Sequence, residues 1–85
     1  MKEIRILGLL ITDRIKEAGR TQVALTKHAR IIKSRLGFHE VSTDVCSRVG
    51  VIIIQLSGNP ADFDQLEQEL KEIGGLEVKS MRFEL

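Results

Sequence analysis

The sequence predicts an α+β sandwich in which an antiparallel sheet of four strands carries two helices on one face. The first observation is the order of extended and helical segments, which is β-α-β-β-α-β. The second is the stretch Val49–Leu56, V-G-V-I-I-I-Q-L, whose β-branched residues place large apolar side chains on both faces of a central strand. With right-handed crossovers, this order is the ferredoxin-like fold, in which the first and third strands lie at the centre.

The first strand is predicted over Ile4–Ile11, I-R-I-L-G-L-L-I, which is apolar on nearly both faces. Gly8 interrupts it, as glycine does at a bulge or at the close approach of another backbone, including that of a partner subunit. Thr12 and Asp13 then offer N-cap side chains to a helix. The apolar face of that helix is predicted from positions at helical spacing, which are Ile15, Ala18, Gln22, Leu25 and Ala29.

The alternation of Ile31–Phe38 predicts an edge strand with a charged side. His39–Ser47 is polar and lacks helical period, so it is predicted to be a long hairpin connection to the central strand. Asn59 is predicted to cap a second helix that begins at Pro60 and ends at Gly74-Gly75. The apolar stripe of this helix is Phe63, Leu66, Leu70 and Ile73, and the last strand is predicted over Leu76–Phe83.

The central strands predict self-assembly. Both of their faces are apolar, whereas an 85-residue chain has too few elements for a second layer of helices. A second copy of the same sheet is therefore the expected cover, which makes the chain a homo-oligomer. Val49, Val51 and Ile53, or their neighbours on the opposite face, are the predicted interface, because alternation alone leaves open which face meets the helices.

Composition narrows the classes of function. With 13 Lys and Arg against 12 Asp and Glu, the net charge of +1 predicts no direct binding to nucleic acid or to anionic membranes. Cys46 is the only cysteine, which excludes an internal disulfide and fits a reducing cytoplasm. No apolar run reaches the length of a membrane span, so we expect a soluble, complete, cytoplasmic chain whose residues 1–85 form a single domain.

The residues that could carry chemistry are few. His28, His39 and Cys46, with Glu40 and Asp44, could form a transition-metal site. The alternative places His28 at a helix C-terminus, His39 in a polar turn and Cys46 as a small semi-buried apolar residue. No arrangement of nucleophile, base and orienting group is visible, so we expect a protein that is not an enzyme.

Short motifs along nearly the whole chain resemble one family. They are I-L-G-L-L-I-T-D-R at 6–14, I-I-K-S-R-L-G at 31–37, Glu40, V-I-I-I-Q-L-S-G at 51–58 and G-G-L-E-V-K-S at 74–80. Together, in this order, they resemble the small regulators of iron-only hydrogenase systems. Two departures from the family pattern are Thr26, where members usually carry a histidine, and Phe38-His39, where many have I-P-Y.

The resemblance implies a ligand-sensing domain. Its expected relatives are the C-terminal domain of nickel-responsive regulators and the ACT-type amino-acid-sensing domains. Alignment on Gly58 places Gly50 where the nickel sensors carry their cysteine ligand, and His39 and Cys46 do not fall on the ligand spacing of those sensors. Nickel binding is thus not carried over, and we expect a protein without the DNA-binding ribbon-helix-helix of those sensors.

The resemblance therefore implies a non-enzymatic sensory or regulatory module that acts through a ligand or a protein partner. The alternative function is a transition-metal sensor or chaperone, with no cofactor established. The residues that match the family's shared positions, together with His39, form the predicted ligand site: Asp13, Arg14, Arg35, Gly37, His39 and Glu40. Their structural alternative is a helix cap at Asp13, ion pairs at the two arginines and a strand-end bend at Gly37.

Overall fold

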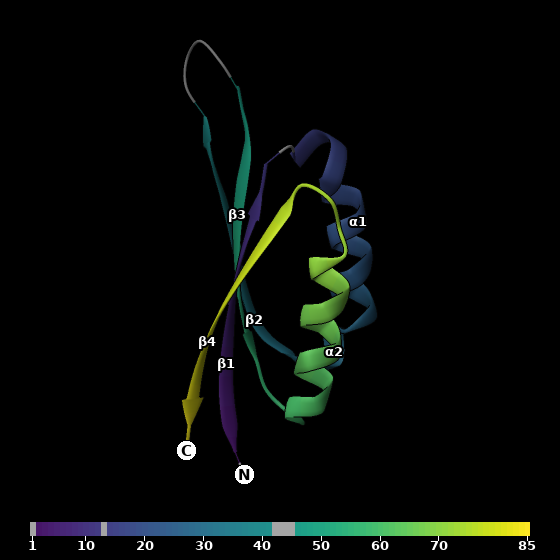
Figure 1. The fold of residues 1–85 in the computed structure, drawn as a ribbon. Coiled ribbons are helices and arrows are strands. Elements are labelled where there is room, and N and C mark those ends of the chain that lie inside the picture. The colour runs from purple at the N-terminus through teal and green to yellow at the C-terminus, as the bar shows by residue number, and fades with distance from the viewer. Residues whose placement is uncertain (1, 13, 42–45) are drawn as a thin grey trace.

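The computed structural model describes residues 2–12, 14–41 and 46–85, and the side chains of 14–18, 38–41 and 46–48 lie outside that description. The elements follow in the order β1 (Glu3–Ile11), α1 (Arg14–Lys27), a 3-10 turn (Ala29–Ile31), β2 (Ile32–Val41), β3 (Cys46–Leu56), α2 (Pro60–Lys71) and β4 (Leu76–Glu84). The strands form one antiparallel sheet in the order β2-β3-β1-β4. Both helices cover the same face (Figure 1). The predicted ferredoxin-like fold is confirmed.

The core lies between the sheet and the two helices. On β1, alternate residues from Arg5 to Ile11 are buried, and Leu7 pairs with Ile54 of β3 and with Ser80 of β4. Ile52, Ile54 and Leu56 are likewise buried. The face of β3 that meets the helices is therefore the one that carries Ile52, a point that the alternation of the sequence left open.

Helix α2 is built as its sequence predicts. Asn59 caps it, because its side-chain Oδ1 accepts a hydrogen bond of 3.0 Å from the backbone amide of Ala61. The stripe of Phe63, Leu66 and Leu70 is fully buried against the sheet. The helix ends at Lys71, before the predicted Gly74, and the left-handed residue of the turn that follows is Gly75, with φ of 80°.

The predicted face of α1 needs a correction. Thr21 and Leu25 are buried, whereas Gln22 is exposed. The buried face therefore passes through Thr21, since a helical neighbour of Leu25 at either i−3 or i−4 satisfies the spacing. The side chains of Ile15 and Ala18 and the predicted cap at Asp13 lie outside the described residues. No helix in the described ranges has the length and apolar character needed to cross a membrane.

The predicted connection between the second and third strands was wrong at both ends. Strand β2 continues through Val41 and β3 begins at Cys46, so the described residues of His39–Ser47 are strand. The ladder persists because His39 pairs with Gly50 and Val41 with Cys46. The irregularities of register lie in the pairing of β2 with β3, between Ile32 and Ser34 and between His39 and Val41. The pairing of Gly8 with Ile53 and Lys79 is regular.

Candidate functional site

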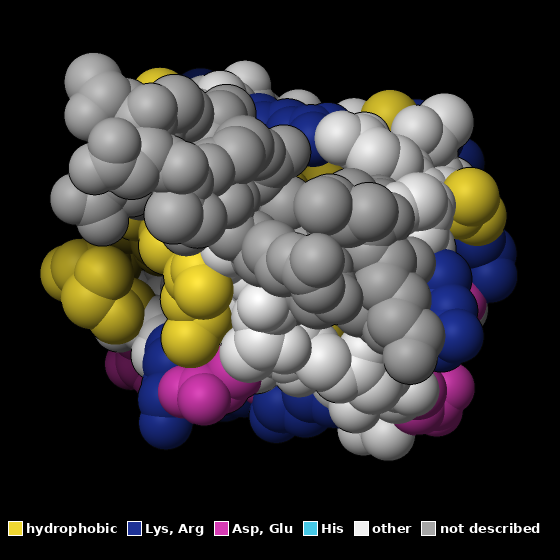
Figure 2. Space-filling view, turned by 90° about the horizontal axis from the view of Figure 1, so that it is seen from above, with side chains coloured by type: hydrophobic (Ala, Val, Ile, Leu, Met, Phe, Trp, Pro, Cys, Tyr) yellow, Lys and Arg dark blue, Asp and Glu magenta, His cyan; other side chains and the backbone are white. Residues whose placement is uncertain are grey.

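The sheet has one face without helices, which we call the open face, and the predicted interface residues lie on it. Val49 and Ile53 are 43% and 40% exposed, and Val51 is half-buried. Further large apolar side chains that the strand register places on the same face, and that are at least half exposed, are Leu36, Met81 and Phe83. In Figure 2, hydrophobic side chains gather on the left, the side of the open face. Their exposure leaves this apolar surface available for contact.

A hollow of about 280 Å³ lies in the middle of the open face, above Gly8. Its walls are mainly apolar, and we call it the Gly8 hollow. The residues that line it are Ile6, Gly8, Ile53, Lys79, Ser80 and Met81. The hollow exists because Gly8 places no side chain between its cross-strand neighbours Ile53 and Lys79.

The predicted ligand site is only partly described. Arg35 and Gly37 lie on β2, and the guanidinium of Arg35 donates a 3.0 Å hydrogen bond to the side-chain carbonyl of Gln22 on α1. An added Cβ at Gly37 would meet Ile52 at 3.9 Å, which is ordinary contact. Asp13 lies outside the described residues, as does the side chain of Arg14. Arg35 thus binds a neighbouring helix rather than the other predicted site residues described here.

His39 and Glu40 were predicted in a loop, and this was wrong because both belong to β2. Their side chains lie outside the described part of the chain. The backbone nevertheless brings the two halves of the predicted site to one end of the sheet, since Gly50 pairs with Ile11 on one side and with His39 on the other.

His28, from the predicted metal set, forms an ion pair with Glu69 of α2 and is 12% exposed. The other carboxylate oxygen of Glu69 accepts a 2.6 Å hydrogen bond from Lys27. Hydrogen bonds from Lys27 and then His28 hold the pKa of Glu69 below its usual value. Among the described residues no three His, Cys, Asp or Glu side chains gather as metal ligands. The side chains of His39 and Cys46 lie outside that set.

A second cavity, of about 340 Å³, lies between the end of α1 and the start of α2. Lys27, His28 and Arg30 give it a basic wall, and Asp62 contributes a carboxylate. The start of α2 at this cavity is already capped. The side-chain oxygen of Asn59 accepts a hydrogen bond from the amide of Ala61, and its backbone carbonyl accepts one from the amide of Asp62. We assign it no ligand.

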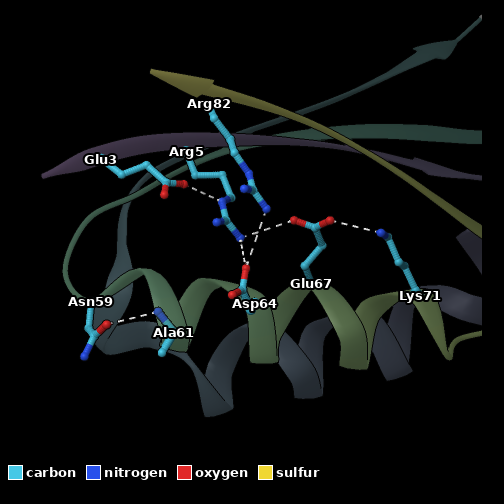
Figure 3. A network of polar contacts seen from close by, with 8 residues as sticks. All are labelled: Glu3, Arg5, Asn59, Ala61, Asp64, Glu67, Lys71 and Arg82. Atoms are coloured by element: carbon cyan, nitrogen blue, oxygen red, sulfur yellow. Dashed lines mark hydrogen bonds and ion pairs between the residues drawn. The ribbon is translucent and has the colours of Figure 1, made fainter. Parts of the chain in front are cut away.

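The sequence reasoning missed a buried arginine. Arg5 is 1% exposed and lies between β1 and α2 (Figure 3). Its guanidinium donates to Glu3 at 2.7 Å and to Asp64 at 2.6 Å, and it lies 5.4 Å from the centre of the Phe63 ring. Burial disfavours its charge, but the hydrogen bonds to Glu3 and Asp64 raise the pKa of Arg5 above its usual value.

Glu67 and Arg82 extend this network. A Glu67 carboxylate oxygen lies 3.5 Å from Arg5 without the geometry of a hydrogen bond, and the other lies 3.0 Å from Lys71. Arg82 reaches Asp64 at 3.7 Å. The hydrogen bond from Arg5 is also the main reason that the pKa of Asp64 falls below its usual value. The network ties β1 and β4 to α2 and has a structural role.

Fold and surface together define a ferredoxin-like fold with an apolar sheet face that neither helix covers. No family model and no curated protein matches the chain. The solved structure of the uncharacterized protein TM1266 from Thermotoga maritima is similar, with a TM-score of 0.84 and 21% identity over 99% of this chain and 100% of that one. A dimeric ferredoxin-like protein of unknown function from Thermobifida fusca matches with a TM-score of 0.48 and 12% identity, over 99% and 92%. At 21% identity, the likeness to the Thermotoga protein shows the fold alone.

Proposed function

We propose that this chain is a non-enzymatic regulatory module of an iron-only hydrogenase system, which assembles in the cytoplasm through its open face and acts through a ligand or a protein partner. The observation that supports assembly is the apolar surface on the open face of the two central strands, a face that neither helix covers. Val49 and Ile53, which lie on the part of this surface that β3 provides, stay exposed in the single chain. Covering such side chains would release a favourable hydrophobic free energy.

The dimensions of the open face suit a second copy. Strands of 9 to 11 residues are about 30 Å long at about 3.3 Å per residue, and four strands about 4.8 Å apart span about 19 Å. Two stacked copies would then bury a total of about 1,100 Å² of flat area, which lies just above the roughly 1,000 Å² that a biological interface should exceed.

The distribution of charge also favours contact through the face. Lys79 and Glu77 of the edge strand β4 are exposed at the rim of the open face and lie 3.7 Å apart. An apolar centre with a charged rim is the usual anatomy of a protein interface. Charged edge strands oppose pairing of sheets edge to edge, so the face is the better surface for assembly.

The regulatory part of the proposal is supported by the motifs at 6–14, 31–37, 51–58 and 74–80 and their resemblance to the hydrogenase-system regulators. The end of the sheet where Gly50 pairs with both Ile11 and His39 is the proposed place for a ligand. Polar groups of the predicted set would meet there beside apolar strands.

Sedimentation of the purified protein tests the assembly. We expect a dimer at micromolar concentration, and we expect Ile53→Glu to raise the dissociation constant at least about 100-fold, because a buried unpaired carboxylate is costly. Val23→Glu is the matched control, since Val23 is 70% exposed but lies on α1, away from the sheet. A monomeric wild type, or an Ile53→Glu variant that dimerises normally, would contradict the proposed face.

Deletion of the gene tests the regulatory role. Hydrogenase activity and hydrogenase transcripts should change in the deletion strain, and the wild-type chain should restore them. The Ile53→Glu variant should not restore them if assembly is required. Unchanged activity and transcripts under conditions that induce the hydrogenase would refute the assignment to that system.

A further inference from the structure

Among the described residues, no contact and no backbone conformation requires a glycine at Gly8. The glycines with positive φ are Gly58 and Gly75, so Gly8 has a backbone that any residue can adopt. A Cβ built on Gly8 would meet no atom within 4 Å. Glycine in a strand interior is destabilising because it loses more backbone entropy and packs no side chain. The described part of the single chain therefore gives no reason for a glycine at this position.

The Gly8 hollow can accommodate an apolar group, and in this role we call it the socket. Ile6, Ile53 and Met81 form its walls, and its volume of about 280 Å³ compares with about 30 Å³ for one water molecule in the liquid. Among the described residues that line it, Lys79 is the one with a charged side chain. Sites for small molecules combine apolar walls with a small number of precisely placed polar groups. Among the described residues that line this hollow, the polar side chains are those of Lys79 and Ser80, both on the edge strand β4.

We propose that the Gly8 hollow receives an apolar side chain from the open face of a second copy of this chain. This inference rests on the proposed assembly through that face. It adds that the hollow and the inserted side chain fix the position of one sheet on the other. The same face carries both the hollow and projecting side chains such as Leu36, Met81 and Phe83, which are 59%, 56% and 50% exposed. A two-fold interface needs such self-complementarity, because each copy must present both the socket and the side chain that fills it.

The test is a substitution that fills the Gly8 hollow with a side chain of the same chain. Gly8→Leu places a side chain in the hollow, where space and backbone conformation allow it, so the monomer should keep its fold and its thermal stability. Sedimentation should show a dissociation constant at least tenfold above that of the wild type. Gly8→Ala fills less of the hollow and should give a smaller rise. Gly19→Leu, on α1 and also in open space, is the matched control and should dimerise normally.

Three results separate the two proposals. A weakened Gly8→Leu dimer, together with a normal Gly19→Leu dimer, supports the socket. If Gly8→Leu dimerises like the wild type while Ile53→Glu does not, the open face remains the interface and the socket is refuted. If Ile53→Glu also dimerises normally, or if the wild type is a monomer, the proposed assembly fails and the socket fails with it.

Discussion

The guanidinium Nη1 of Arg5 lies 2.6 Å from Oδ1 of Asp64 and joins β1 to α2 across 59 residues of sequence. Arg5 is buried, whereas the side chain of Asp64 is 65% exposed. The pair therefore runs from the interior to the solvent, and it fixes the N-terminal half of α2 against the sheet. Its geometry leads to the first two predictions.

Arg5→Met should lower the free energy of unfolding by about 3 kcal/mol, because it removes a buried cation from between acidic partners that remain partly buried. Urea denaturation at pH 7 would measure this. Arg82→Met is the control, since Arg82 is exposed and lies 3.7 Å from Asp64. It should change stability by no more than about 0.5 kcal/mol. Equal effects of the two substitutions would show that the buried network does not contribute as described.

Stability should fall at acidic pH. The hydrogen bond from Arg5 holds the pKa of the folded Asp64 below its ordinary value of 3.8. A carboxyl whose pKa is lowered by folding stabilises the protein above its unfolded pKa, and this contribution disappears as pH falls through the folded pKa. Asp64→Asn should thus be destabilising at pH 7 and progressively less so below pH 3.8. In an Arg5→Met background the pH dependence of this difference should shrink, and its persistence would assign the lowered pKa to another group.

The cap of α2 should matter separately from the network. Asn59→Ala removes the acceptor of the Ala61 amide and should cost about 1 kcal/mol. Asn59→Asp keeps an acceptor oxygen and serves as the matched control. Thermal unfolding monitored by circular dichroism would compare the two, and an Ala variant as stable as the Asp variant would argue against the cap.

Two glycines should respond to the same substitution with opposite signs. Gly58→Ala should destabilise by about 1 kcal/mol or more, because the φ of 126° at Gly58 disfavours a side chain. Gly19→Ala should stabilise by about 0.5 to 1 kcal/mol, because Gly19 lies inside α1 and has space for a methyl group. Urea titrations of both variants would measure the two signs.

Replacement of Arg35 tests the predicted ligand site. Arg35→Ala removes an exposed hydrogen bond to Gln22 and should change the free energy of unfolding by no more than about 0.5 kcal/mol. If Arg35 also holds a ligand, the variant should lose the thermal stabilisation given by whichever compound in a metabolite and metal screen stabilises the wild type. Equal stabilisation of the variant by that compound would remove Arg35 from the site.

The central strands could be predicted from the sequence, because residues 4–11 and 49–56 are apolar on both faces. Short runs of this kind are typical of strands inside a sheet. The ends of β2 and β3 could not be predicted from the sequence. The segment around His39 and Val41 is polar and shows no regular alternation, and its strand conformation comes from pairing with Gly50 and Cys46. Such pairing depends on a partner strand, which short-range periodicity does not show.

Within the site, alternation did identify the residues of β3 that would share a face, such as Val49 and Ile53. The sequence also contained a signal for Arg5, which stands two residues before Leu7 on the buried face of β1. A charge at such a position requires a partner in the interior. The partner could not be read from sequence, since Asp64 lies on a different element and its own side chain is exposed.

The backbone amide of Leu85 donates to the carbonyl of Lys2 at 3.1 Å, and both ends of the chain lie side by side (Figure 1). A short flexible linker would therefore join them, and new ends could be opened in the exposed turn at Gly74 and Gly75. In that permuted chain β4 and β1 become a local hairpin, whereas the natural order must bring Glu3 to Glu84 across the whole sequence. Because rates of folding rise as contacts become more local, the permuted chain would fold faster with the same native contacts.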